Sequence, residues 1–372
     1  MRGIRAAIAF GLTLATACAF DLGGFTAGDA SSSGDGGSSS GGGGSSSGMN
    51  PPPPADASDD YDVLPIAAKY QRTLPIANGA AVELPAQYTV CFAAPGIVGA
   101  DLIASGHVRA DLADLRVFGP SGEIHRVIDT LTPSRTELCF RLERAIAAGT
   151  TDDGYSLHYG DPSAAPPPDT SADVFAFFDG FDGAAIDKRW LMNGAPTLAG
   201  GILVLPKNGE PGLTTTATSD GVDTTASLEI RAKVDDPSSA PETSSGYYWW
   251  LGFQHTGDFT ANAPWDVFIG RSKNTVEAEH NTLTGSCTGG CDDNALGQTS
   301  DFRIYRVDRS TAVVDFYYDD GTKFEGAGSN GDLSIMLRNF LVTSDVEIDW
   351  VRARPLVAPE PTTVLGPETS IP

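Results

Sequence analysis

The chain has 372 residues and a formal net charge of −24, because 48 acidic side chains face 24 basic ones. This balance argues against nucleic acid and anionic membrane surfaces as partners, since both would repel the chain. Gly occurs 43 times and Pro 25 times, helix-period patterns are scarce, and short strand-like runs are punctuated by turns. The pattern predicts an all-β chain that is long enough for two domains.

The first residues predict export. Arg2 and Arg5 precede a short apolar run, 6–17, which ends on small residues, so residues 1–17 have the layout of a secretory signal peptide. The run is shorter than the roughly 20 apolar residues that a membrane span needs. An ordinary signal peptide that happens to contain a cysteine is one interpretation of Cys18.

Residues 14–18, Leu-Ala-Thr-Ala-Cys, resemble the lipobox of bacterial lipoproteins. The resemblance implies that Cys18 is acylated and becomes the new N-terminus. The residue after the cysteine is Ala19 and not Asp. Among Gram-negative lipoproteins this resembles the pattern of those sorted to the outer membrane. The implied location is the outer membrane, at the cell surface or the periplasmic face, with the lipid as the only attachment to the membrane.

Residues 18–60 predict a tether. They consist largely of Ser/Gly blocks and end in the proline run 51–54, a composition with little to bury against a core. A Gly/Ser coil of about forty residues reaches roughly 35 Å on average. We therefore expect a disordered stalk that holds the globular part away from the membrane.

Four cysteines remain once Cys18 is set aside, and four allow three disulfide connectivities. We favour Cys91–Cys139, because both lie within apolar strand-like runs, and Cys287–Cys291, because both flank a short polar loop. A zinc site at the second pair lacks a further ligand pair nearby.

The first globular unit is predicted over residues 61–161 and is followed by the proline-rich linker 162–172. It contains Tyr-Gln-Arg-Thr-Leu-Pro-Ile at 70–76, Asp-Leu-Arg-Val-Phe-Gly at 114–119 and Tyr-Ser-Leu-His-Tyr-Gly at 155–160. In this order the motifs resemble domain-of-unknown-function family 2341, a β-sandwich module of bacterial surface and secreted proteins. The resemblance implies a fold and a surface context and no catalytic residue.

The second unit is predicted over residues 173–354, before a disordered Pro/Thr-rich tail at 355–372. It opens with Phe-Phe-Asp-Gly-Phe-Asp at 177–182, has a hairpin at 312–324 with an Asp-Gly turn, and closes with Val-Glu-Ile-Asp-Trp-Val-Arg at 346–352. These segments resemble the concanavalin-A-like lectin/glucanase superfamily. The resemblance implies a jelly roll, so the chain as a whole is expected to hold two antiparallel β-sandwich domains.

The catalytic pattern of the related glucanases is not found. Those enzymes carry alternating carboxylates on a central strand, and retaining hydrolysis needs two carboxyl groups roughly 5–5.5 Å apart. Glu347-Ile-Asp349 lacks the following Glu and belongs to the last strand. Glu277 and Glu279 would share one face of a strand, as an acid pair or as a solvated surface.

The last strand suggests a metal role instead. In lichenase-type relatives the Asp of a similar final strand helps to hold a structural calcium ion, and Asp349-Trp-Val-Arg matches that strand. The resemblance implies further ligands from backbone carbonyls near Asp179 and Gly200, which suit Ca²⁺. The alternative is an Asp that caps the strand edge through hydrogen bonds.

Aromatic residues suggest a ligand surface. The run 247–250, Tyr247-Tyr248-Trp249-Trp250, places alternate rings on opposite faces of a strand, so one pair should enter the core and the other can present flat surfaces to sugars. Trp265 and Asp266 follow nearby and could join the second pair. Core packing of all four rings is the alternative.

Together these patterns predict a lipid-anchored cell-envelope protein that displays a non-catalytic sandwich for glycan or another extracellular polymer. Structural Ca²⁺ is the only cofactor expected. The alternatives are a glycoside hydrolase of the laminarinase or lichenase type and a purely structural or adhesive envelope protein.

Overall fold

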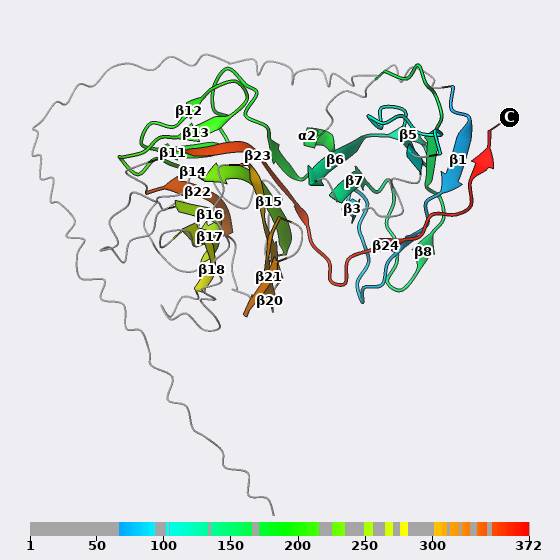
Figure 1. The fold of residues 1–372 in the computed structure, drawn as a ribbon. Coiled ribbons are helices and arrows are strands. Elements are labelled where there is room, and N and C mark those ends of the chain that lie inside the picture. Colours follow the sequence, from blue (N-terminus) through cyan, green and yellow to red (C-terminus); the bar gives the residue numbers. More distant parts are fainter. Residues whose placement is uncertain are drawn as a thin grey trace, which may run out of the picture. The chain divides into compact units, whose positions relative to one another are not determined.

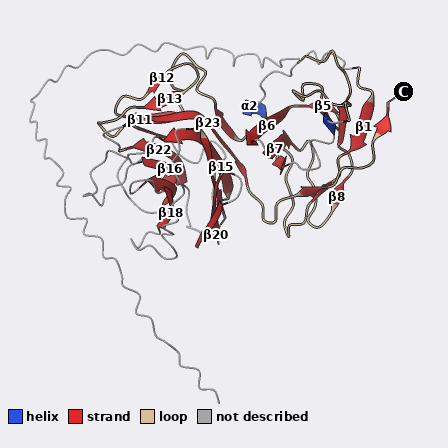
Figure 2. Cartoon of the chain, viewed as in Figure 1, coloured by secondary structure: helices blue, strands red, loops and turns tan. Residues whose placement is uncertain are grey.

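The computed structural model describes residues 67–93, 102–103, 105–132, 135–165, 171–215, 225–234, 249–255, 265–270, 276–281, 301–310, 313–319, 322–327, 333–340 and 344–371. In this part of the chain nearly all regular structure is β-strand and the sheets are antiparallel, so the all-β prediction is confirmed (Figures 1 and 2). A short helix, α2 (Ser171–Val174), lies between two groups of strands. No helix in the described part is long and apolar enough to cross a membrane.

The first group of strands, here called the first sandwich, forms three small sheets with the orders β25-β1-β9-β4-β5, β24-β2-β8 and β3-β7-β6. Its strands are β1 (Tyr70–Thr73), β2 (Ile76–Ala77), β3 (Thr89–Ala93), β4 (Arg116–Gly119), β5 (Gly122–Ile124), β6 (Arg126–Thr132), β7 (Arg135–Arg141), β8 (Thr151–Asp152), β9 (Ser156–Tyr159), β24 (Thr362–Thr363) and β25 (Thr369–Ser370).

The first sandwich encloses its own hydrophobic core, to which β7 contributes by simple alternation. Leu138 and Phe140 are fully buried in that core, while Cys139 and Arg141 point to the opposite face of the strand, as a period of two requires. That second face carries the side chains through which the first sandwich contacts the rest of the chain.

The second group, the second sandwich, has an eight-stranded sheet of order β12-β13-β23-β15-β19-β20-β21, with β10 also paired to β23, and a six-stranded sheet of order β11-β14-β22-β16-β17-β18. Its strands are β10 (Phe177–Asp179), β11 (Trp190–Asn193), β12 (Thr197–Leu198), β13 (Leu203–Leu205), β14 (Gly212–Thr215), β15 (Ala226–Val234), β16 (Trp249–His255), β17 (Trp265–Gly270), β18 (Val276–Asn281), β19 (Arg303–Arg309), β20 (Val313–Tyr318), β21 (Thr322–Ala327), β22 (Leu333–Asn339) and β23 (Val346–Pro355).

The core of the second sandwich lies between these two sheets. On β15 the small and aliphatic residues at even positions, such as Leu228 and Ile230, enter the core, while Glu229 and Arg231 lie on the outer face. The predicted hairpin at 312–324 is present as β20 paired with β21. Alternation therefore assigns each strand one core face and one outer face.

The final strand β23 carries a β-bulge. Its pairing with β15 shifts between Arg231 and Ala232, so that Asp349 is the extra residue, and on its other edge β23 exchanges β13 for β10 at the same place. The bulge turns Asp349 out of the regular ladder.

The Cys91–Cys139 disulfide predicted from the sequence is present. The two residues are direct partners in the antiparallel register of β3 and β7, which brings their side chains together. Cys287 and Cys291 lie outside the described residues.

The tail contradicts the expectation of disorder at 355–372. After β23 the chain returns to the first sandwich, where β24 pairs with β2 and β25 pairs with β1. Val357 and Leu365 pack against the core of the first sandwich. Proline and threonine content suggested fraying, but burial of these two apolar side chains and two strand pairings stabilise the segment.

Several predicted features fall outside the described residues: the signal peptide, Cys18, the tether to residue 60, Tyr247 and Tyr248. They stay predictions.

Candidate functional site

The outer face of the six-stranded sheet, the face turned away from the sandwich core, is the candidate site. On β16, Trp249 is fully buried in the core, and Trp250 lies on the opposite face. Alternation therefore places the two indoles on opposite faces, as predicted, and both are fully buried. Neighbouring strands β22 and β17 flank β16 across this face (Figure 1).

Aromatic side chains gather on this outer face. Trp250 and Trp265 lie with ring centroids 5.3 Å apart, and Trp250 meets Phe340 edge to face at 5.7 Å. Val267 and Ile269 of β17 complete the group, which is separate from the sandwich core. The side chains of Trp250, Trp265, Val267 and Ile269 are only 0–6% exposed, so the chain itself covers this part of the outer face.

Polar groups share the face with these rings. The register pairs Gln254 of β16 with Ser334 of β22 and Trp265 of β17, and it pairs Thr214 of β14 with Met336 of β22. Directly paired residues in an antiparallel sheet point to the same side. The outer face therefore combines aromatic rings with an amide and two hydroxyl groups.

Three of these polar atoms are buried without a hydrogen-bond partner in the described part of the chain: Thr214 Oγ1, Ser334 Oγ and Trp265 Nε1. The three side chains are only 0%, 1% and 6% exposed. Buried polar groups in proteins are nearly always paired, so each exception needs a physical explanation. Hydroxyl groups of a ligand both donate and accept, so they could pair with these atoms, but only after the part of the chain that covers them moves away.

Gly252 separates Trp250 and Gln254 on this face. A Cβ at Gly252 would lie 2.3 Å from the carbonyl oxygen of Asp266 and 2.8 Å from the Cα of Val267. Only glycine allows the backbones of β16 and β17 to approach so closely. The centre of the face consequently carries no side chain at this position.

Asp266 does not belong to the site, contrary to expectation. It is fully buried on the core side of β17, where its Oδ2 accepts a hydrogen bond from Arg309 Nε of the opposite sheet at 3.0 Å. The physical reason is again alternation, since Trp265 and Asp266 are adjacent and must face opposite sides. Sequence proximity grouped two residues that the strand separates.

Glu277 and Glu279 occupy register positions beside the aromatic cluster. On β18 they pair with Ile269 and Val267 of β17, both of which belong to the outer face. The backbone therefore places both glutamate positions along that face, but the side chains of β18 lie outside the described set. A catalytic role for them stays a prediction.

Residues predicted to hold calcium are engaged otherwise. The Asp349 carboxylate forms an ion pair with Arg231, and Asp179 accepts hydrogen bonds from Phe181 N at 2.8 Å and from Trp190 Nε1 at 2.7 Å. A guanidinium beside the carboxylate repels a cation. The calcium site at Asp349, with further ligands from backbone carbonyls near Asp179 and Gly200, stays a prediction.

The third residue of that prediction, Gly200, lies in the turn between β12 and β13 with φ of +62°. Its neighbours Ala199 and Ile202 close the turn through mutual backbone hydrogen bonds of 2.9 and 3.2 Å. The glycine serves the backbone geometry that the turn requires.

Sequence reasoning missed Thr214, Gln254 and Ser334. Gln254 could have been found, since it follows Trp250 at a spacing of four in the same strand and so shares its face. Thr214 and Ser334 are recognisable only through the pairing of β14, β22 and β16, which joins segments far apart in the chain.

No family model matches the chain, and no curated protein matches it. Solved structures do. One is a structure described under endo-acting O-glycanases that prominent members of the human gut microbiota express to initiate mucin breakdown. It is 14% identical in sequence, the match covers 49% of this chain and 99% of the other, and the TM-score is 0.39.

Two others are the laminarinase from Rhodothermus marinus and a lichenase, a β-1,3-1,4-glucanase, from a mouse hindgut metagenome. The first shares 13% identity over 49% of this chain and 97% of its own, with a TM-score of 0.36. The second shares 16% identity over 48% of this chain and 99% of its own, with a TM-score of 0.35. Sequence identities and TM-scores this low are no basis for assigning the activity of these proteins to this chain.

Proposed function

We propose that the second sandwich binds a glycan or a similar polyhydroxylated polymer on the outer face of its six-stranded sheet. One observation carries the proposal: Thr214, Ser334 and Trp265 hold buried polar atoms without partners in the described residues, next to aromatic rings on the same face. A sugar combines apolar C–H faces, which pack on indole rings, with hydroxyls that pair with such atoms.

We further propose that the protein is exported and held at the outer membrane by a lipid on Cys18. The lipobox-like sequence at 14–18 and the Ser/Gly-rich tether support this location. The Cys91–Cys139 disulfide is a third support, since disulfides persist in oxidising compartments outside the cytoplasm. Labelling cells with a fatty-acid analogue tests the anchor, and label retained by Cys18→Ser contradicts it.

The binding proposal is tested on the chain carrying Cys18→Ser with a glycan array, followed by calorimetric titration of any glycan that binds. Thr214→Val and Ser334→Ala each remove one unpartnered hydroxyl. In the free protein this removal costs little and can stabilise, because no hydrogen bond is lost. With ligand, each variant should lose about 1 kcal/mol, or about fivefold in Kd.

Trp249→Phe is the matched control, because it changes a ring in the core and none on the outer face. It should lower the melting temperature and leave the affinity unchanged. Absence of binding to every glycan and polymer tested, or equal affinities for the two hydroxyl variants and the unmodified chain, contradicts the proposal.

A second candidate is hydrolysis of the bound glycan. The register positions of Glu277 and Glu279 beside Ile269 and Val267 favour it, since alternating glutamates on the ligand face could act as acid and nucleophile. The test is release of reducing ends from β-glucans. Release that disappears in both Glu277→Gln and Glu279→Gln, with binding retained, would establish an enzyme; no release leaves a binding protein.

A further inference from the structure

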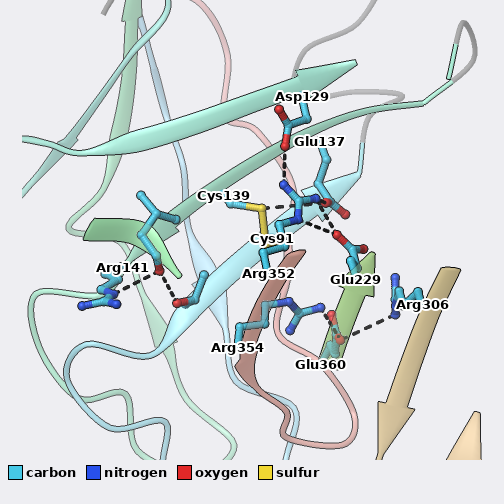
Figure 3. Close-up of a disulfide and its surroundings, with 12 residues drawn as sticks. Cys91, Asp129, Glu137, Cys139, Arg141, Glu229, Arg306, Arg352, Arg354 and Glu360 are labelled. Atoms are coloured by element: carbon cyan, nitrogen blue, oxygen red, sulfur yellow. Dashed lines mark hydrogen bonds and ion pairs between the residues drawn. A yellow bond between two sulfur atoms is a disulfide. The ribbon is translucent and has the colours of Figure 1, made fainter. Parts of the chain in front are cut away.

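The contact between the two sandwiches contains a buried cluster of charges around Arg352 of β23 (Figure 3). Arg352 is 2% exposed. Its Nε donates to Glu229 Oε2 at 2.6 Å, its Nη2 donates to Glu137 Oε2 at 2.9 Å, and its Nη1 pairs with Asp129. We call these four residues the Arg352 junction.

The junction joins different parts of the fold. Glu229 lies on β15, in the same sheet as Arg352, whereas Asp129 and Glu137 lie on β6 and β7 of the first sandwich. The planar guanidinium is therefore held by partners from both sandwiches at once, and its fixed fork geometry restricts their orientation.

Aromatic rings and charges both favour the ionised Arg352. The guanidinium carbon lies 4.6 Å from the ring centroid of Phe175 and also 4.6 Å from that of Trp350. Burial alone lowers the pKa of Arg352, but the nearby carboxylates of Glu229, Asp129 and Glu137 outweigh it and raise this pKa above its usual value.

An apolar contact adjoins the junction. Cys139 of the disulfide packs with Val174, the last residue of α2, and with Phe175, which follows it. Glu137 Oε2 lies 3.8 Å from Cys139 Sγ. Side chains of the first sandwich also satisfy the carbonyl groups of this segment. Arg141 donates to Val174 O at 3.0 Å and to Phe175 O at 2.6 Å.

The returning tail adds a second connection. Glu360 accepts a hydrogen bond from Arg354 at 2.7 Å and lies 3.8 Å from Arg306, both on the outer face of the eight-stranded sheet. Three residues earlier, Val357 N donates to the hydroxyl of Tyr88 at 3.1 Å. Between β23 and β24 the tail therefore contacts both sandwiches, the first through Val357 and the second through Glu360.

We propose that the Arg352 junction couples the two sandwiches into one cooperative folding unit. The inference goes beyond the proposed function and does not depend on it. The physical reason is the free-energy cost of separating the sandwiches. Separation takes the carboxylates of Asp129 and Glu137 away from Arg352, so that these charges lose their ion pairs until water solvates them. It also removes the guanidinium of Arg352 from the ring of Phe175.

Differential scanning calorimetry of the full chain carrying Cys18→Ser tests the coupling. This protein should melt in one transition, with a calorimetric to van't Hoff enthalpy ratio of about 1. The double variant Asp129→Asn and Glu137→Gln removes the two carboxylate charges of the first sandwich that contact Arg352 and keeps the pair of Arg352 with Glu229. We expect two transitions and a ratio of about 2, since each sandwich then melts alone.

Arg231→Gln is the matched control. It removes the ion pair with Asp349, which lies on the same outer face but within the second sandwich, and it should keep a single transition. Arg352→Gln serves as a second disruption if the double variant expresses poorly. A single transition in both disrupted variants, or two transitions in the unsubstituted chain, overturns the proposal; glycan affinity is a separate readout and should not change.

Discussion

Asp266 and Arg309 face each other between the two sheets of the second sandwich, with side chains 0% and 1% exposed. Both charges are removed from water, and each compensates part of the desolvation cost of the other. Such a pair adds little net stability relative to apolar packing, but losing one partner leaves a buried charge uncompensated. The pair therefore specifies how β17 and β19 face each other.

Replacing Asp266 by Asn should lower the free energy of unfolding by about 3–5 kcal/mol, because Arg309 remains buried and charged. Urea denaturation followed by tryptophan fluorescence measures the change. Asp349→Asn is the control, since the Arg231 side chain opposite it is 42% exposed, and we expect a loss of at most about 1 kcal/mol. Equal losses in the two variants would contradict a special role for the buried pair.

At the scale of elements, the two-residue strand β25 shows how a short segment can be held in place. Ile371 N donates to Lys69 O at 2.8 Å. Glu368, just before β25, accepts from Tyr159 at 2.9 Å and lies 3.0 Å from His107 Nδ1. Backbone pairing alone is marginal for so short a strand, and these side-chain bonds supplement it.

The Glu368 contacts make the end of the tail sensitive to acid. Partial burial acts to raise the pKa of Glu368, but hydrogen bonds with His107 and Tyr159 outweigh it and lower this pKa from 4.5. Because the pKa of Glu368 is lower in the folded state, its ionised form stabilises the fold at pH values above the pKa of the unfolded state. This stabilisation is lost as the pH falls through the pKa of the folded state.

Amide hydrogen exchange measures this effect. The protection factor of Ile371 should be constant above pH 4.5 and should fall as the pH drops below it, while Cys139 in β7 keeps its protection over the same range. In Glu368→Gln the protection of Ile371 should no longer depend on pH in this window. A protection factor for Ile371 that is the same at all pH values in the unsubstituted chain would contradict the prediction.

At the scale of the whole molecule, residues 356–371 return to the first sandwich, where β24 and β25 pair with β2 and β1. Val357 and Leu365 pack on the core of the first sandwich, and Arg72 Nε donates to Gly366 O at 2.7 Å. The first sandwich is therefore built from both ends of the globular sequence, and its stability depends on residues that follow the second sandwich.

Truncation after Pro355 should destabilise the first sandwich. Loss of two partly buried apolar side chains and of the pairings of β24 and β25 should cost about 2–4 kcal/mol, which corresponds to a fall in melting temperature of about 5–15 °C. Thermal unfolding followed by circular dichroism measures it. Truncation after residue 371 is the control. If removal of residues 356–372 leaves the melting temperature unchanged, the tail does not contribute to the stability of the first sandwich.

Much of the strand pattern could be predicted from the sequence. The alternation at 247–250 correctly separates Trp249 from Trp250, and the apolar runs around Cys91 and Cys139 locate the disulfide. The alternation of side chains along β16 does not by itself show which face of the strand meets the core, because each face carries one indole. Asp266 was grouped with Trp265 because the two residues are adjacent in sequence, although alternation places adjacent residues on opposite faces.

The sequence by itself determines the all-β character and the strand periods, because these depend on neighbours within one strand. It favours the Cys91–Cys139 pair without selecting it from the three possible connectivities, and the register of β3 and β7 decides it. Only the tertiary structure decides that Asp349 faces Arg231, that Thr214 and Ser334 join Trp265 on one face, and that the tail is ordered. These outcomes depend on pairings between segments far apart in the chain, where register and burial, and no local preference, select the partner.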